Sequence, residues 1–192
     1  MATQFADNVR SSTATASASF TAWVTFALTF GLMMSDYISR QVLLAVFPFL
    51  KSAWNLSDTQ LGSLVSIVAL MVGVLSIPIS FAADRWGRVK SIAAMACVWS
   101  LATIACGLAT NYGQMFAARA VVGLGEAAYV TAGGAILMYA FPPRQRSTVM
   151  GVFLGGALFG SVVGVALGGV VATRLGWPWA FIAVGVPGLA LA

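Results

Sequence analysis

The chain alternates long apolar segments with short polar ones. A helix that crosses the hydrocarbon core of a bilayer needs about 20 mostly apolar residues, because that core is about 30 Å thick and every backbone polar group must be paired inside it. Six segments fit or approach this description, at residues 20–50, 58–83, 89–109, 112–141, 147–173 and 177–192. The pattern predicts an all-α membrane protein with a bundle of six transmembrane helices.

The two ends of the chain differ from the segments between them. The sixth segment begins near Trp177 and has only 16 residues up to Ala192, fewer than a full span requires. We therefore expect a truncated sixth helix and a sequence that is a fragment of a longer protein. Residues 1–19 are rich in Ser, Thr and Ala and have no apolar periodicity, so we expect them to form a disordered tail.

Composition supports a membrane protein and removes several classes of function. Hydrophobic residues occupy 60% of the 192 positions and charged residues only 8%, whereas soluble domains carry about 25% charged residues. The chain has no histidine, which excludes the nucleophile pairs, zinc sites and haem sites that depend on imidazole. We expect no enzymatic activity, no catalytic residues, no cofactor and no metal site.

The basic residues indicate which side of the membrane each polar segment faces. The net charge of +5 does not indicate nucleic acid as a partner here, because most basic residues lie between hydrophobic spans. If the N-terminus is cytoplasmic, the inside segments hold Arg10, Arg85, Arg88, Lys90, Arg144 and Arg146, and the outside loops hold Lys51 and Arg174. This excess predicts that residues 1–19 form a cytoplasmic tail.

Four ionisable residues lie within the predicted spans: Asp36, Arg40, Arg119 and Glu126. Each costs about 2.5–3.5 kcal/mol on insertion scales, so each is expected to face a partner or a water-filled cavity. Asp36 and Arg40 are four residues apart and share one helix face, where they can form an ion pair. Arg119 and Glu126 are about two turns apart and point the same way. If the two faces meet, two acids lie near the midplane beneath two arginines.

Two interpretations of these charges remain open. In the first, they line a central cavity in which Arg40 or Arg119 attracts an anionic group and Glu126 or Asp36 exchanges protons with water. In the second, they are buried ion pairs that only fix the rotation of the helices. The neighbouring Tyr37 and Tyr129 are likewise open to two interpretations, since each can donate a hydrogen bond to a substrate or simply pack against another helix.

The loop between the second and third spans carries a distinctive motif. Residues 80–90 read SFAADRWGRVK. The segment resembles the signature loop of the major facilitator superfamily, GxLaDrxGRrk, with matches at Asp84, Arg85, Gly87, Arg88 and Lys90 and with Ser80 in place of the first glycine. An ordinary basic loop would explain the arginines but not the Asp and Gly at this spacing. The resemblance implies a cytoplasmic gate in which Asp84 and Arg88 contact the other half of a transporter.

Two further segments resemble elements of the same family. Residues 119–127, RAVVGLGEA, are similar to the RxxxGxGeA element and most like the spinster branch, which has bacterial and animal members. They also resemble some organic-anion:cation symporters. That branch has adjacent Asp and Arg on its first helix, whereas this chain has Ser39 before Arg40 and its acid one turn earlier, at Asp36. The departure favours Glu126 as the proton site. Residues 176–181, GWPWAF, resemble the GWRWaF junction that opens the sixth helix of the family.

Glycine recurs at every fourth position of the fifth span, at Gly156, Gly160, Gly164 and Gly168. This spacing predicts a helix face without side chains, on which another helix can pack closely. The stretch also resembles the antiporter element GxxxGPxxGG, but Val165 stands where the proline would be. That difference argues against drug antiport.

The resemblance implies the N-terminal six-helix half of a secondary transporter, built as a 3+3 inverted repeat and paired with a C-terminal half. By this interpretation the chain is multi-pass, lies in the inner membrane of a bacterium, and moves a small organic anion or an amphipathic lipid-like solute by alternating access, coupled to protons. The alternatives are a channel subunit or a membrane scaffold that transports nothing. An intramembrane enzyme is a weaker alternative, because no Ser and Lys pair stands out within the spans.

Overall fold

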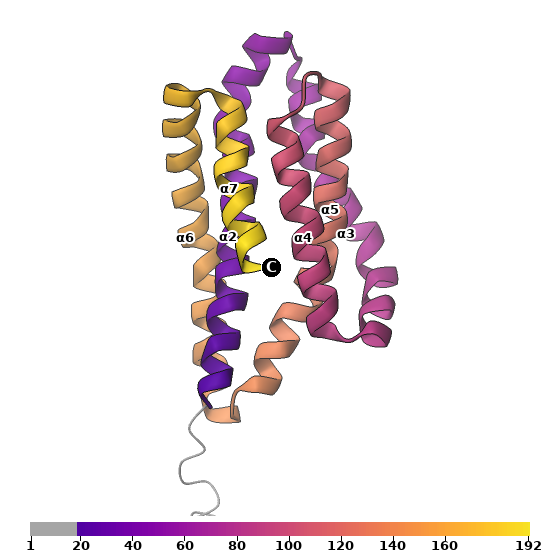
Figure 1. Ribbon diagram of the computed structural model, residues 1–192, viewed down its shortest axis with the longest axis vertical. Coiled ribbons are helices and arrows are strands. Elements are labelled where there is room, and N and C mark those ends of the chain that lie inside the picture. Colours follow the sequence, from indigo (N-terminus) through magenta and orange to yellow (C-terminus); the bar gives the residue numbers. More distant parts are fainter. Residues whose placement is uncertain (1–18) are drawn as a thin grey trace, which may run out of the picture.

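The computed structural model describes residues 19–192, apart from the side chains of residues 83, 84, 88, 89 and 128–132. Residues 1–18, which include most of the predicted tail, lie outside the described part. The helices are α2 (Phe20–Trp54), α3 (Asp58–Trp86), α4 (Arg88–Gly107), α5 (Tyr112–Ala140), α6 (Pro143–Leu175) and α7 (Trp177–Leu191). No strand occurs within residues 19–192, which confirms the predicted all-α fold (Figure 1).

Capping side chains explain where several of these helices begin. Ser19 Oγ accepts a hydrogen bond from the amide of Ala22 at the start of α2, and Asn111 Oδ1 accepts one from the amide of Gln114 at the start of α5. Helix α6 starts at Pro143, before the predicted position 147, because a proline at the first helical position loses no intrahelical hydrogen bond. Helix α2 extends to Trp54, past the predicted end at residue 50.

The six helices form two groups of three. Helices α2, α6 and α7 pack together on one side of the bundle, and α3, α4 and α5 pack together on the other (Figure 1). Suppose that α2, α3 and α4 are exchanged, in that order, with α5, α6 and α7. The contact between α2 and α6 then becomes the observed contact between α5 and α3, and the contact between α4 and α5 becomes the observed contact between α7 and α2. The α4–α7 contact, which joins the two groups, maps onto itself. This symmetry of contacts is the one expected for a 3+3 repeat.

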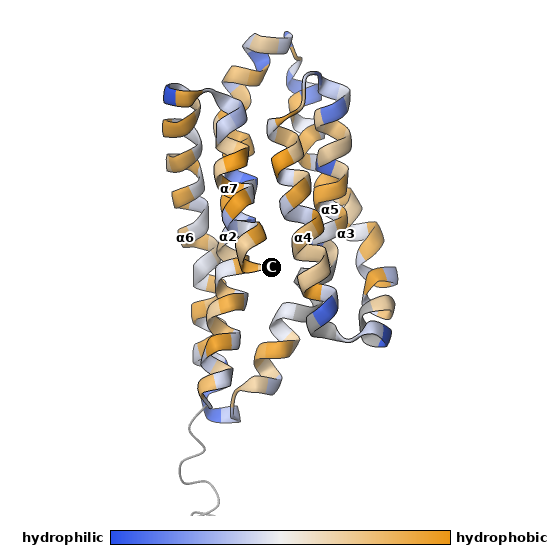
Figure 2. Ribbon diagram, viewed as in Figure 1, coloured by the Kyte–Doolittle hydropathy of each residue, from blue (hydrophilic) through white to orange (hydrophobic). Residues whose placement is uncertain are grey.

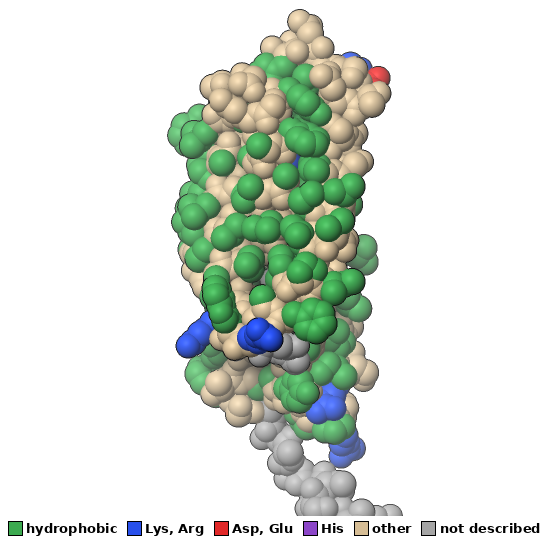
Figure 3. Space-filling view, turned by 90° about the vertical axis from the view of Figure 1, so that its right-hand side faces the viewer, with side chains coloured by type: hydrophobic (Ala, Val, Ile, Leu, Met, Phe, Trp, Pro, Cys, Tyr) green, Lys and Arg blue, Asp and Glu red, His purple; other side chains and the backbone are tan. Residues whose placement is uncertain are grey.

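The outer surface of the bundle is apolar enough for a lipid environment. Three segments of the described residues are long and apolar enough to cross a membrane, at Asp58–Ala82, Lys90–Gly107 and Pro143–Leu175. Hydrophobic residues recur along each helix of the bundle (Figure 2). Figure 3 shows hydrophobic side chains along one whole face, with Lys and Arg side chains gathered near its lower end. Exposed apolar side chains of this kind are satisfied by lipid, as in an integral membrane protein.

The four spaced glycines of α6 all lie against α2. A Cβ atom on Gly160 would lie 2.9 Å from the carbonyl oxygen of Met34, and one on Gly164 would lie 2.7 Å from that of Ile38. Gly156 faces the ring of Phe30, and Gly168 faces the Cα atom of Val42. This close approach fixes the rotation of α2, and so determines which of its side chains face the rest of the bundle.

Candidate functional site

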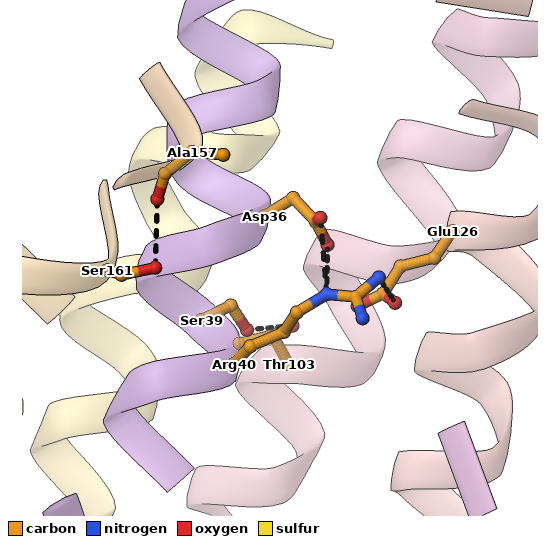
Figure 4. A network of polar contacts seen from close by, with 7 residues as sticks. All are labelled: Asp36, Ser39, Arg40, Thr103, Glu126, Ala157 and Ser161. Carbon is orange, nitrogen blue, oxygen red and sulfur yellow. Dashed lines mark hydrogen bonds and ion pairs between the residues drawn. The ribbon is translucent and has the colours of Figure 1, made fainter. Parts of the chain in front are cut away.

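Three of the four embedded charged residues meet in one cluster. On α2, the Nε atom of Arg40 donates to the two carboxylate oxygens of Asp36 at 3.3 and 3.2 Å. The Nη2 atom of the same guanidinium donates to Oε2 of Glu126, on α5, at 2.5 Å (Figure 4). Arg40 is therefore shared by two carboxylates, and it joins two helices that have few other contacts with each other.

The members of this cluster differ sharply in exposure. The side chains of Asp36 and Glu126 are 5% and 2% exposed, whereas that of Arg40 is 35% exposed. The Oε1 atom of Glu126 is buried and makes no hydrogen bond within the described part of the chain. Arg40 is thus the partly exposed member of the cluster, and the two acids with which it pairs are buried.

Arg119 does not join this cluster. Its side chain is buried, and its Nε donates to the carbonyl oxygen of Leu64 on α3 at 3.4 Å. Its Nη1 atom is also buried and has no hydrogen-bond partner among the described residues. The sequence placed Arg119 and Glu126 on one face of α5, but the long arginine side chain turns towards α3. The structure therefore brings together two acids and one arginine instead of two.

Buried hydroxyl groups lie directly behind the cluster. Ser39 Oγ is 3.4 Å from Oγ1 of Thr103 on α4 (Figure 4). Thr103 also donates to the carbonyl oxygen of Trp99, one turn earlier on α4, at 2.9 Å. The Ser39–Thr103 contact joins α2 to α4 beside the turn that carries Arg40. Sequence reasoning missed Ser39 and Thr103 as supporting residues, although a serine beside an embedded arginine was a visible signal.

Of the two tyrosines beside the embedded acids, Tyr37 and Tyr129, the structure describes the side chain of Tyr37 only. Tyr37 is half-buried, with its Cβ atom facing Gly160 of α6, and the guanidinium carbon of Arg40 is 5.8 Å from the centre of its ring. This distance allows a cation–π contact that holds the arginine in place. The side chain of Tyr129 lies outside the described residues.

The loop motif between α3 and α4 is described only in part. Arg85 and Lys90 are exposed, and the side chains of Asp84 and Arg88 lie outside the described residues. Gly87 has φ +96°, in a region that side chains other than glycine rarely occupy, and it separates the two helices. The glycine of the motif therefore makes the sharp turn that brings α4 back across the bundle.

Comparison with known proteins places this geometry in a family. The sequence model described as the Major Facilitator Superfamily matches residues 13–192. The hexuronate transporter of Bacillus subtilis is 27% identical over 80% of this chain and 36% of its own length. A probable sphingolipid transporter of Arabidopsis thaliana, spinster homolog 1, is 31% identical over 69% of this chain and 27% of its own length.

A solved structure has the same fold. It is a bacterial homolog of the human lysosomal transporter Spinster in an inward-facing, unoccupied conformation, with a TM-score of 0.82 and 25% identity over 91% of this chain and 42% of that one. The chain thus spans between about a quarter and two fifths of the length of these relatives. Since the family model matches nearly the whole sequence and the helices are arranged as in a solved relative of one branch, the chain belongs to the major facilitator superfamily.

Proposed function

We propose that this chain forms one half of a proton-coupled carrier for an organic anion. The single observation behind the proposal is the sharing of Arg40 between Asp36 and Glu126, two buried carboxylates from two different helices. With both acids ionised, the three side chains carry a net charge of −1. An anion that binds Arg40 would bring the cluster to −2 in a region where uncompensated charge is costly. Uptake of one proton by the cluster removes this excess, so anion binding and proton binding favour each other.

Glu126 is the better candidate for the protonated group. Its Oε1 atom has no hydrogen-bond partner in the described structure, whereas Asp36 accepts from Arg40 through both of its oxygens. A proton on Glu126 weakens its ion pair with Arg40 and leaves the guanidinium available to a substrate anion. Because that ion pair links α2 to α5, its loss also removes a contact between the first three helices and the last three.

The names of relatives support an anionic substrate. The Bacillus subtilis relative is named a hexuronate transporter, and an Escherichia coli relative, 27% identical over 82% of this chain, is named a probable L-galactonate transporter. Both names denote sugar acids, which are anions at neutral pH. The Arabidopsis thaliana relative, named for sphingolipid, keeps an amphipathic solute open as the second substrate class.

We place the carrier in the inner membrane of a bacterium, with the N-terminus in the cytoplasm and with a C-terminal half completing the central cavity. The exposed Arg85 and Lys90 lie at one end of the bundle, as cytoplasmic residues do under the positive-inside rule. Asp84 and Arg88 of the same loop would form the cytoplasmic gate with the C-terminal half. Tyr37 would hold Arg40 in position for the substrate, and Tyr129 would contact the substrate from α5.

Calorimetry tests the link between anion and proton. The chain is purified into nanodiscs and titrated with one of two monocarboxylates, phenylbutyrate or glucuronate. Each titration is repeated in two buffers that differ in ionisation enthalpy. The difference in heat between the buffers gives the number of protons taken up on binding. We expect about one proton per bound anion near neutral pH, since linkage makes the two binding events reciprocal. In the Glu126→Gln chain, proton uptake should fall towards zero.

The matched control is Asp58→Asn, because Asp58 is an exposed acid at the end of the bundle and pairs only with Lys51 among the described residues. That variant should keep the proton uptake of the wild type. Unchanged uptake in the Glu126→Gln chain would remove Glu126 as the proton site. A wild-type chain that binds neither anion would contradict Arg40 as an anion site in this half.

A further inference from the structure

A hollow lies at the corner where α5 ends and α6 begins. It has a volume of about 420 Å³ and is lined by Ala135, Met138, Tyr139 and Arg146. The first three residues share one face of the last turns of α5, because they are three and four residues apart, and Arg146 is the fourth residue of α6. Since all four residues line one hollow, a single ligand can contact the arginine and the α5 surface together.

Arg146 is held at this hollow and keeps most of its hydrogen-bonding capacity. Its Nε atom donates to the carbonyl oxygen of Phe141, the residue that caps the end of α5, at 2.9 Å. This is the one hydrogen bond that Arg146 donates within the described part of the chain. A guanidinium has five N–H groups, so those on the two Nη atoms are left for a further acceptor.

The acids of the chain do not supply that acceptor in the part that the structure describes. The chain has only five acidic residues, and the three with described side chains pair with cations in the charged cluster or at the opposite end of the bundle. Arg85, Lys90 and Arg144 are exposed at the same end as Arg146, and Figure 3 shows Lys and Arg side chains gathered there. This excess of positive charge favours an anionic partner from outside the chain.

The order of the side chains along the hollow fits a phospholipid at a membrane surface. Arg146 lies at the end of the bundle, and arginine binds phosphate through paired hydrogen bonds. The side chain of Tyr139 is 82% exposed, and tyrosine rings in membrane proteins collect at the level of the headgroups. Ala135 lies about 6 Å further along α5, towards the middle of the bundle, where acyl chains begin.

We propose that the α5–α6 hollow binds an anionic phospholipid, with its phosphate on Arg146 and the first carbons of its acyl chains over Ala135 and Met138. Basic pockets between transmembrane helices bind such headgroups in membrane proteins generally. A zwitterionic lipid offers the same phosphate, but its cationic group would meet the basic end of the bundle without an acid to pair with. The inference uses no member of the charged cluster, so it does not depend on the proposed function.

Native mass spectrometry of the chain in detergent micelles tests the site. Phosphatidylglycerol, which is anionic, and phosphatidylcholine, which is zwitterionic, are titrated separately with identical acyl chains, and the fraction of lipid-bound chain gives an apparent Kd for each. We expect phosphatidylglycerol to bind more tightly. Arg146→Gln should weaken its binding about tenfold, because paired charge-assisted hydrogen bonds are lost. Phosphatidylcholine should be weakened less, so the preference between the lipids shrinks.

The matched control is Arg174→Gln, which removes the same charge from an exposed arginine at the other end of α6. It should leave the preference unchanged. Ala135→Phe is a second variant, which fills the hollow without changing its charge and should also weaken the binding of phosphatidylglycerol. Thermal unfolding checks that each variant is folded.

Several results would overturn the site. Equal effects of Arg146→Gln and Arg174→Gln, or equal binding of the two lipids by the wild type, would show that the hollow does not select an anionic lipid. If the Ala135→Phe chain binds phosphatidylglycerol as the wild type does, the lipid lies elsewhere and the hollow is left for a segment of another protein. Displacement of the lipid by an excess of inorganic phosphate would indicate a site for free phosphate instead.

Discussion

Replacing Arg40 with glutamine is expected to lower the free energy of unfolding by about 3–5 kcal/mol, the usual effect of removing one partner from a buried ion pair. The reason is the burial of the two acids, whose side chains are at most 5% exposed and whose cation partner in the cluster is Arg40. Without the guanidinium, either two negative charges remain buried or protons must be taken up to neutralise them. Equilibrium unfolding in mixed detergent micelles near neutral pH, followed by tryptophan fluorescence, measures the loss.

Two comparisons tie that loss to charge. Adding Asp36→Asn and Glu126→Gln to the Arg40→Gln chain removes the uncompensated charges and should restore most of the stability. The deficit of the single variant should also shrink as the pH falls, because protonation of the acids removes the charge that Arg40 balances. Lys51→Gln is the control: its ion pair with Asp58 is exposed, so its loss should be below about 1 kcal/mol. A loss for Arg40→Gln no larger than for Lys51→Gln would show that water already screens the cluster.

Much of this cluster could be predicted from residue spacing. The four-residue separation of Asp36 and Arg40 places them on one face of a helix, and the structure shows them in contact. The cost of embedding an acid predicted that Glu126 would face a partner or a water-filled cavity, and in the structure a cation is its partner. Spacing alone could not show which arginine that cation would be, because the answer depends on which helices lie against α5.

Arg119 shows why spacing along the sequence could not predict every member of the charged cluster. It shares a face of α5 with Glu126, but its long side chain can reach more than one neighbouring helix, and the structure places α3 close enough to receive it. Gly123 permits that approach, since a Cβ atom there would lie 2.8 Å from the carbonyl oxygen of Val68 on α3. Hydropathy predicted the fold class from the lengths of the apolar segments. It contained no information about which pairs of helices pack together.

The glycines of α6 gave a stronger signal, although an incomplete one. Their four-residue spacing predicted a face for close packing, but any other helix could have been the partner. The structure places them against α2, so that they support the helix that carries Asp36 and Arg40. The position of the charged cluster therefore depends on the close approach of α2 to α6, which only glycine permits at these positions of α6.

Gly164→Ala is accordingly expected to lower the free energy of unfolding by about 1–3 kcal/mol, the range for an added group in a fully packed contact. The new methyl group would lie 2.7 Å from the carbonyl oxygen of Ile38 and 2.9 Å from its Cα atom. Both are backbone atoms, so no change of rotamer can relieve the overlap and the two helices must separate. Equilibrium unfolding in mixed micelles measures the loss, and anion affinity reports whether Arg40 has moved with α2.

Gly155→Ala is the matched control, because a Cβ atom at Gly155 has no neighbour within 4 Å among the atoms compared. The same methyl group on the same helix should leave stability unchanged or raise it slightly, since alanine favours helix over glycine by up to about 1 kcal/mol. Equal losses in the two variants would mean that glycine acts through the flexibility of α6. A loss confined to Gly164→Ala, together with weaker anion binding, would show that contact between α6 and α2 holds the charged cluster in place.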